Sequence, residues 1–358
     1  ARRTCPVSGP LRLDSVALAR EAWEFQQRLA EGARVLAQVG QVDYGATPRQ
    51  EVWRDGKVVL YRFAAEGPVS GPPLLIVYAL VNRPYMVDLQ ADRSLVRGLL
   101  ALGVDVYVLD WGYPDRSDRF LTLDDYINRY IDGAVDHLAG LHGGPVNLLG
   151  VCQGGALSLC YSALHPGKVR NLVTMVTPVD FHTPDNMLSN WVRGLDVDLF
   201  VDALGNVPAD LMNASYLMLK PFRLNLQKYV GLVDALGDAK AVEDFLRMEK
   251  WIFDSPDQVG EAFRDFVKQF YQGNAFVNRT ARIGGQAVDL GFIDMPVLNV
   301  YAEQDHLVPP AASRALRDLV GTRDYTELGF RGGHIGIYVS SRAQREVPAA
   351  IHGWLAAR

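Results

Sequence analysis

The sequence predicts an α/β protein with a mainly parallel sheet flanked by helices and a mostly helical insertion. Nearly continuous apolar, β-rich runs alternate with helical stretches, which is typical of parallel strands covered on both faces. The runs recur regularly as far as Pro178, and the next begins only at Met295. The 358 residues, 49% hydrophobic and 22% charged, can form one large core that carries an inserted subdomain.

The first elements precede the alternating part. Residues 11–38 repeat apolar side chains at helical spacing and predict an amphipathic helix. Residues 51–64 alternate around Asp55-Gly56 and predict a β-hairpin.

Six further runs are predicted strands, and a helix lies between two of them. The helix begins near Thr122, where Thr122 and Asp125 resemble a capping box. The strands are expected at 73–80, 104–111, 145–152, 169–178, 295–302 and, more weakly patterned, 325–330.

Residues 181–290 are rich in aromatic and charged residues and lack clear parallel-strand runs. We expect them to form a helical cap over the carboxyl ends of the strands, where open α/β sheets hold their ligands. The predicted division is an N-terminal helical segment at 1–40, a core at 41–180 and 291–358, and a cap at 181–290.

Composition argues against several classes of function. A formal charge of −5 and the absence of a basic cluster disfavour nucleic-acid binding. Three cysteines are too few for a disulfide framework and indicate free thiols in a reducing, cytoplasmic compartment. No apolar run approaches the length of a membrane span, and no metal-binding or nucleotide-hydrolysis motif occurs, so we expect no metal site and neither export through this terminus nor a membrane-spanning segment.

The central motif is Gly150-Val151-Cys152-Gln153-Gly154-Gly155, between an apolar strand and a helical segment. In that context G-x-C-x-G resembles the nucleophile elbow G-x-S-x-G, with Cys152 as nucleophile, and therefore predicts an α/β-hydrolase fold. Glycines are needed because the tight turn leaves no room for flanking side chains. The alternative is that Cys152 is a small packing residue.

The partners of such a nucleophile follow in the order acid, then histidine. Asp305 comes just after the strand 295–302, and His334 lies in a glycine-flanked loop after the last strand. Each could instead be a turn cap or a surface residue. His306 adjoins Asp305 and is a candidate for contact with the substrate. The remaining histidines are expected to be surface or satisfied core residues: His137, His142, His165, His182 and His352.

An oxyanion hole should complete the site. The backbone N–H of Gln153 is one predicted donor, and that of Val81, after the strand 73–80, is the other. Cys160, inside the helix that follows the elbow, is expected to be core packing, and Cys5 an inert terminal residue.

Several segments resemble the polyhydroxyalkanoate synthases along nearly the whole chain from about residue 40. They are IVYALVNRPYMVDLQ (76–90), DVYVLDWGYPDRSDRFLTLDDYI (105–127), NLLGVCQGG (147–155), MVTPVDFHTPDN (175–186), MEKWIFDSPDQ (248–258), QDHLVPP (304–310) and GGHIGIYVS (332–340). The short length resembles the two-component class III type, whose catalytic subunit works with a second subunit called PhaE.

The resemblance implies an acyltransferase that polymerises (R)-3-hydroxyacyl-CoA, such as 3-hydroxybutyryl-CoA, through an acyl-cysteine on Cys152, with His334 as base and Asp305 as acid. It also implies work on cytoplasmic polymer granules, a homodimer and no cofactor beyond the thioester substrate. Either His334 or Asp305 could activate the elongating hydroxyl. Two alternatives stay open: a cysteine-nucleophile ester hydrolase, such as a polyester depolymerase or a dienelactone-hydrolase-like enzyme, and a non-catalytic granule-associated protein. Candidate cations for the coenzyme A phosphates are Arg223, Lys228, Arg247 and Lys250.

Overall fold

The computed structural model describes residues 44–219 except 46 and 66, residue 232, residues 236–358, and six residues between 16 and 27. The chain forms two compact units, one of residues 1–42 with 220–249 and one of residues 43–219 with 250–358. The six described residues of the predicted helix 11–38 are helical, and the rest of that prediction lies outside the described residues. The predicted boundaries near residues 40, 180 and 290 stay a prediction.

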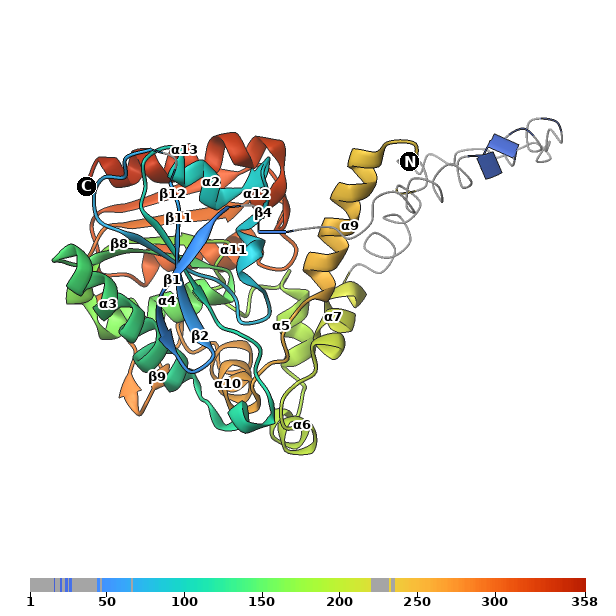
Figure 1. Ribbon diagram of the computed structural model, residues 1–358. Helices are drawn as coiled ribbons and strands as arrows, with labels where there is room; N and C mark the ends of the chain where they lie inside the picture. Colours follow the sequence, from blue (N-terminus) through green and yellow to red (C-terminus); the bar gives the residue numbers. More distant parts are fainter. Residues whose placement is uncertain are drawn as a thin grey trace, which may run out of the picture. The chain divides into compact units, whose positions relative to one another are not determined.

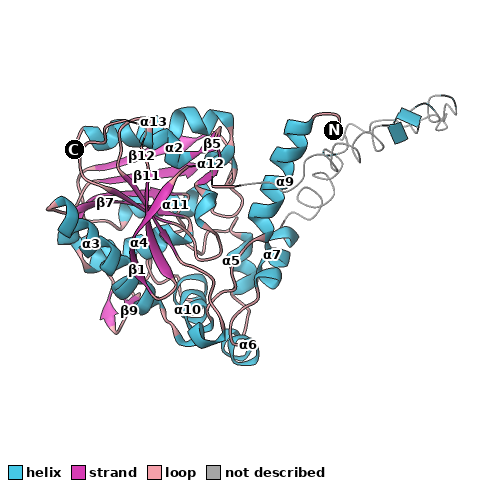
Figure 2. Ribbon diagram, in the orientation of Figure 1, coloured by secondary structure: helices cyan, strands magenta, loops and turns pink. Residues whose placement is uncertain are grey.

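The larger unit is built on an eight-stranded sheet (Figures 1 and 2). Strands β1 and β2 form the predicted hairpin, whose loop residues are Gly56 and Lys57, and β2 pairs antiparallel with β6. All later pairings are parallel, which confirms the predicted mainly parallel sheet. In spatial order the strands are β1 (Arg49–Asp55), β2 (Val58–Phe63), β6 (Val106–Asp110), β3 (Leu74–Val77), β7 (Val146–Val151), β8 (Val169–Met175), β11 (Val297–Ala302) and β12 (Tyr325–Phe330).

The central strands β3, β6 and β7 are buried along their whole length, because helices cover both faces of the sheet. On one face α2 (Leu95–Leu100) packs on α13 (Ser341–Ala356), and α3 (Asp132–His142) and α4 (Gln153–Leu164) lie on the other (Figure 1). Shorter elements connect them: η1 (Pro84–Met86), β4 (Asp88–Gln90), β5 (Arg93–Ser94), η2 (Arg116–Phe120), η4 (Pro166–Lys168), α11 (Pro310–Arg314), η8 (Ala315–Asp318) and α12 (Gly336–Val339).

The predicted helix start near Thr122 is confirmed, with an unexpected winding. The Asp125 carboxylate accepts hydrogen bonds from the Thr122 N–H at 2.8 Å and the Thr122 hydroxyl at 2.9 Å. The helix then continues as a π-helix over Asp125–Ile131 before α3. An apolar pattern that is helical in either winding does not distinguish the two.

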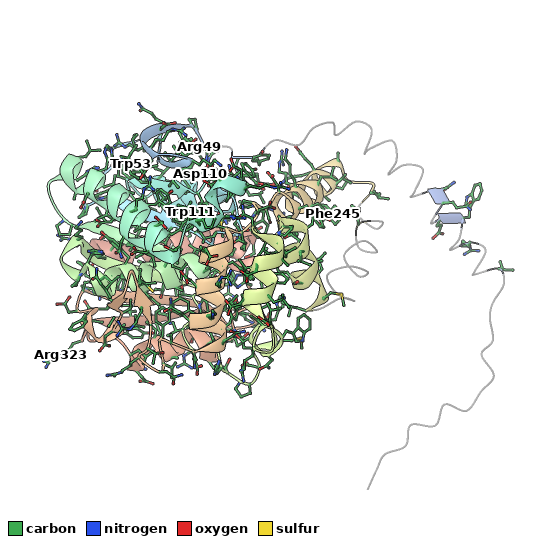
Figure 3. The ribbon with its side chains drawn as sticks, turned by 90° about the horizontal axis from the view of Figure 1, so that it is seen from below. Arg49, Trp53, Asp110, Trp111, Phe245 and Arg323 are labelled. Atoms are coloured by element: carbon green, nitrogen blue, oxygen red, sulfur yellow. The ribbon has the colours of Figure 1, made fainter. Side chains whose placement is uncertain are left out.

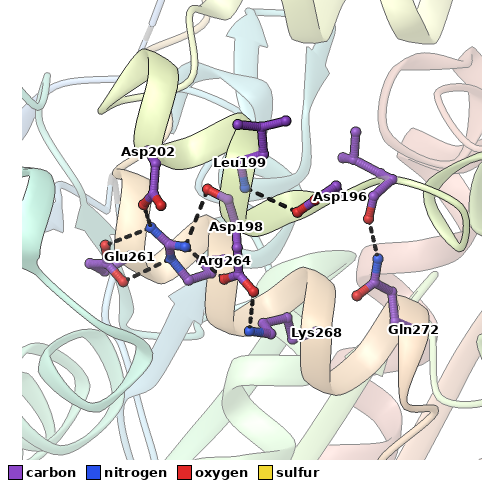
Figure 4. Close-up of polar contacts among 9 residues, drawn as sticks. Asp196, Asp198, Leu199, Asp202, Glu261, Arg264, Lys268 and Gln272 are labelled. Atoms are coloured by element: carbon purple, nitrogen blue, oxygen red, sulfur yellow. Dashed lines mark hydrogen bonds and ion pairs between the residues drawn. The ribbon is translucent and has the colours of Figure 1, made fainter.

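The described part of the segment between β8 and β11 is mainly helical, as expected, with one small two-stranded ribbon. Arg264 on α10 joins this helix to α6 through Asp198 and Asp202, each at 2.6 Å (Figure 4). The elements are α5 (Met187–Val192), α6 (Val197–Leu204), α7 (Ala209–Met218), α9 (Ala239–Phe253), α10 (Gly260–Phe266), a π-helix η6 (Val267–Gln272), β9 (Arg282–Ile283), β10 (Gln286–Ala287) and η7 (Leu290–Phe292).

Candidate active site

Cys152 occupies a strained turn between β7 and α4. Its backbone has φ 54° and ψ −122°, in a region that residues with a side chain seldom adopt. The Cys152 N–H is fixed by the carbonyl oxygen of Met175 at 2.9 Å. Such strain persists where the surrounding structure imposes it, typically at functional sites. Cys152 is half-buried, and its thiol is free.

The flanking glycines are required for steric reasons, as the motif predicts. A Cβ on Gly154 would lie 2.3 Å from the carbonyl oxygen of Val77, and one on Gly150 would lie 2.5 Å from the Cα of Gly155. A Cβ on Gly155 would lie 1.8 Å from the hydroxyl oxygen of Thr177. Helix α4 therefore begins in close contact with the ends of β3 and β7 and with the loop after β8.

The structure brings the predicted acid and histidine together. Nδ1 of His334 lies 2.6 Å from Oδ2 of Asp305, and the two side chains are 9% and 0% exposed. The other oxygen of Asp305 accepts the backbone N–H groups of Leu307 at 2.8 Å and Val308 at 3.0 Å. These contacts fix the carboxylate, which in turn fixes the imidazole ring.

Cys152 lies close enough to His334 for its charge to act on the imidazole. Burial alone would lower the pKa of His334, but the negative charges of Asp305 and of the Cys152 thiolate outweigh burial and raise it well above 6.5. The arrangement therefore favours the charged form of the His334 imidazole. A histidine in this position can take the proton of a cysteine thiol and make the sulfur nucleophilic.

The two predicted oxyanion donors, the N–H groups of Val81 and Gln153, belong to segments that a hydrogen bond joins. The side-chain oxygen of Gln153 accepts the N–H of Leu80 at 3.0 Å, which joins the start of α4 to the loop after β3. Within the described part of the chain, the N–H groups of Val81 and Gln153 have no acceptor. Both amides are thus available to a ligand, and their role as an oxyanion hole stays a prediction.

The loop after β3 is also held by a hydrogen bond from the residue after β6. Trp111, which follows Asp110 at the end of β6 (Figure 3), donates its indole N–H to the carbonyl oxygen of Tyr78 at 3.0 Å. The Asn82 N–H closes a turn onto the carbonyl oxygen of Ala79 at 3.0 Å.

Three tyrosines near Cys152 were not anticipated: Tyr338 is buried, and Tyr216 and Tyr271 are half-buried. Burial is the first cause that raises the pKa of Tyr216, Tyr271 and Tyr338, and the charge of Cys152 raises each further. The Tyr338 ring meets the His334 ring edge to face at 6.0 Å, and its buried hydroxyl has no partner among the described residues. Tyr338 is one helical turn after His334, the only local signal that could have indicated it; Tyr216 and Tyr271 come from the insertion.

The other predicted ligand contacts have mixed positions. His306 is half-buried beside Asp305, and its role stays a prediction. Arg247 pairs with Glu243 and Asp244, so its charge is already partly compensated. The ammonium of Lys250 lies 4.3 Å from the ring centre of Tyr44. Arg223 and Lys228 lie outside the described residues.

The remaining cysteines and histidines have other surroundings. Cys160 is fully buried in α4, and burial raises its thiol pKa, in agreement with a packing role. A ring nitrogen of each of three histidines forms a hydrogen bond away from the site. The partners are the hydroxyl of Tyr107 for His142 at 3.0 Å, the side-chain oxygen of Asn128 for His165 at 2.8 Å and the carbonyl oxygen of Tyr271 for His182 at 3.0 Å. Cys5 lies outside the described residues.

This sheet, with a cysteine at its elbow facing a His–Asp pair, defines a member of the α/β-hydrolase fold, and a family model described as alpha/beta hydrolase fold matches residues 72–340. Two solved structures resemble it at the level of fold: a metagenome-derived lipolytic enzyme described with LipS and LipT (TM-score 0.51, 13% identity, 81% of this chain and 96% of that chain) and a thermophilic esterase of Thermogutta terrifontis (TM-score 0.51, 18% identity, 89% and 99%).

Within this fold the chain belongs to the family of the poly(3-hydroxyalkanoate) polymerase subunit PhaC, a family of transferases. It is 60% identical to the protein of that name from Allochromatium vinosum, across 97% of this chain and 99% of the relative. The Thiocystis violacea protein is 56% identical, across 97% and 98%, and the Synechocystis protein 50% identical, across 94% and 92%. These matches confirm the resemblance found in the sequence. Among the described residues no helix is both long and apolar enough to cross a membrane.

Proposed function

We propose that the chain polymerises (R)-3-hydroxyacyl-CoA, with 3-hydroxybutyryl-CoA as the expected substrate, into polyhydroxyalkanoate and releases coenzyme A. The observation that carries this proposal is the cysteine in the elbow of a PhaC-family chain, close to a histidine that contacts a buried carboxylate at 2.6 Å. The thioester supplies the driving force, so the reaction needs no further cofactor.

In the first step His334 takes the proton of the Cys152 thiol, and the thiolate attacks the carbonyl carbon of the acyl-CoA thioester. The N–H groups of Val81 and Gln153 stabilise the oxyanion that forms. The bond between the carbonyl carbon and the coenzyme A sulfur then breaks. The departing thiolate takes the proton from His334, which leaves an acyl-cysteine and free coenzyme A.

In the second step the 3-hydroxyl of another unit attacks the acyl-Cys152 thioester. The hydroxyl proton passes to a base as the ester bond forms, and the Cys152 sulfur leaves. Both Asp305 oxygens already accept hydrogen bonds, one from His334 and the other from Leu307 and Val308. These contacts favour His334 as the base, with Asp305 orienting it and stabilising its charge.

Cysteine suits this chemistry better than serine. An acyl-thioester stays reactive towards a hydroxyl, whereas a serine ester would be about as stable as the polyester product. Growth also requires that water be kept from the acyl-enzyme, and the half-buried Tyr216 and Tyr271 of the insertion contribute to that exclusion.

We further propose that the chain acts with a second subunit of the PhaE type, forms a homodimer and works at the surface of cytoplasmic polymer granules. The relatives carry the name of a polymerase subunit, which supports the first of these proposals.

The test is release of coenzyme A from (R)-3-hydroxybutyryl-CoA by the full chain, with and without a co-expressed second subunit, and with Cys152→Ala as the control. We expect release by the unaltered chain, insoluble polyester as product, and no release by Cys152→Ala. Hydrolysis of finished polyester without thioester turnover would contradict the proposal and favour an ester hydrolase. Turnover by Cys152→Ala would remove the nucleophile assignment.

A further inference from the structure

Gln258 lies in the insertion between α9 and α10, 178 residues from Leu80. It is 4% exposed. Its side-chain amide donates to the carbonyl oxygen of Leu80 at 3.1 Å and to that of Pro256 at 3.3 Å. Because carbonyl oxygens only accept hydrogen bonds, these contacts fix which side-chain atom is the nitrogen.

The Leu80 carbonyl belongs to the same peptide unit as the Val81 N–H. A peptide bond is planar, and the described residues include no cis bond, so its C=O and N–H point in opposite directions. A hydrogen bond that holds the Leu80 oxygen therefore fixes the direction of the Val81 N–H. It also polarises the amide and strengthens the N–H as a donor.

The preceding peptide unit is fixed in the same way by another glutamine. The Leu80 N–H donates to the side-chain oxygen of Gln153 at 3.0 Å. Both peptide units around Leu80 are thus held by glutamine side chains, one from the residue after the nucleophile and one from the insertion. The Val81 N–H is left without an acceptor in the described part of the chain.

The backbone of Gln258 is anchored independently of its side chain. Its N–H donates to the carbonyl oxygen of Val207, and the Val207 N–H donates to the carbonyl oxygen of Gln258, both at 2.8 Å. A substitution that keeps the size of the side chain can therefore remove the donor to Leu80 without releasing this segment.

We infer that Gln258 is a positioning residue by which the insertion orients the Leu80–Val81 peptide as an oxyanion donor. The inference rests on the proposed function. It extends that function, because the rate of acylation then depends on a hydrogen bond that the insertion supplies. Gln258 itself touches no reacting atom.

The test separates two reactions of the same sulfur. Acylation by (R)-3-hydroxybutyryl-CoA forms an oxyanion, whereas alkylation by iodoacetamide needs the Cys152 thiolate but forms none. In Gln258→Met of the full chain, we expect the rapid-quench rate of first coenzyme A release at saturating thioester to fall about 10-fold or more, since losing one oxyanion donor costs roughly 10²–10³. The alkylation rate of Cys152 should stay within about two-fold of the unaltered protein, because the donor removed serves only the oxyanion.

Gln272→Met is the matched control. Gln272 also donates its side-chain amide to two backbone carbonyls, of Val192 at 3.3 Å and Leu195 at 2.7 Å, and neither belongs to the Leu80 loop. We expect both rates to be unchanged in this variant. A second variant, Gln258→Glu, keeps the shape but cannot donate when ionised, so its acylation rate relative to the unaltered protein should recover as the pH falls and the carboxyl becomes protonated.

Four results would overturn the inference: normal acylation by Gln258→Met, equal losses of acylation and alkylation, an equal loss of acylation in Gln272→Met, or no recovery of Gln258→Glu. Failure of the proposed function looks different, because the unaltered protein would then release no coenzyme A, and the inference would fall with it.

Discussion

At the scale of single residues, the imidazole of His334 is subject to two opposing effects. Burial disfavours its charged form, while the adjacent carboxylate of Asp305 and the thiolate of Cys152 favour it, and the charges prevail. The hydrogen bonds that Asp305 receives from two backbone amides keep the carboxylate in place. The protonation state of the site is therefore set by three side chains from three separate loops.

The raised pKa of His334 predicts how stability depends on pH. A group whose folded pKa lies above its unfolded value stabilises the fold fully below the unfolded pKa, about 6.5, and loses this contribution as the pH rises through the folded pKa. We expect the stability advantage of the unaltered protein over His334→Gln to shrink as the pH rises above about 6.5 and through the raised pKa of His334. Urea unfolding at several pH values measures it, and an advantage that grows with pH would contradict the prediction.

Asp305→Asn should separate the two steps of the reaction. A thiol has an ordinary pKa of about 8.5 and supplies some thiolate unaided, whereas a hydroxyl must lose its proton as it attacks. An asparagine amide donates to Nδ1 of His334 and favours the wrong tautomer for a base. We therefore expect chain extension to slow more than acylation.

Rapid-quench measurement of the first coenzyme A released, beside mass spectrometry of the Cys152 peptide, checks the Asp305 prediction. Acyl-enzyme or short oligomers should accumulate on Cys152. An equal fall in both rates would contradict this prediction. It would show that Asp305 only positions His334 and has no special role in ester formation.

At the scale of elements, the elbow depends on how closely α4 approaches β3. Gly154→Ala would place a Cβ 2.3 Å from the backbone oxygen of Val77, so the helix or the strand must shift. We expect a loss of roughly 1–3 kcal/mol in the free energy of unfolding and a large loss of coenzyme A release, because the Cys152 turn shifts with the helix.

Gly140→Ala is the control, since Gly140 is an exposed glycine of α3 with nothing within 4 Å of an added Cβ. It should raise the free energy of unfolding by up to about 1 kcal/mol and leave activity unchanged. Thermal or urea unfolding measures both variants. A Gly154→Ala protein as stable and active as Gly140→Ala would contradict this account of the elbow.

The contacts of Asp254, the residue after α9, illustrate what the sequence could not predict. Asp254 accepts hydrogen bonds from the hydroxyls of Tyr85 at 2.5 Å and Tyr113 at 2.9 Å. Burial and the Asp254 contact raise the pKa of both tyrosines, that of Tyr113 to about 12. Asp254 is 169 residues from Tyr85, and Gln258 is 178 residues from Leu80. Such pairings have no local periodicity or turn chemistry that would reveal them.

At the scale of the whole molecule, strands, hairpin and elbow could be predicted because each has a local signature. Asp305 and His334 could be placed together because parallel strands end at one edge of the sheet, so loops after neighbouring strands meet there. The π-helix at Asp125–Ile131 and the buried Tyr338 could not, because both depend on packing between distant segments.

The central claim is that Cys152 carries the growing acyl chain, and one measurement tests it most directly. The full chain is mixed with (R)-3-hydroxybutyryl-CoA, and the reaction is quenched within one turnover. The protein is then digested, and the masses of its peptides are measured by mass spectrometry. The account predicts one or more 3-hydroxybutyryl units on the Cys152 peptide, and none on that peptide in Cys152→Ala. Acyl units on a different residue, or coenzyme A release without any acyl-protein, would contradict it.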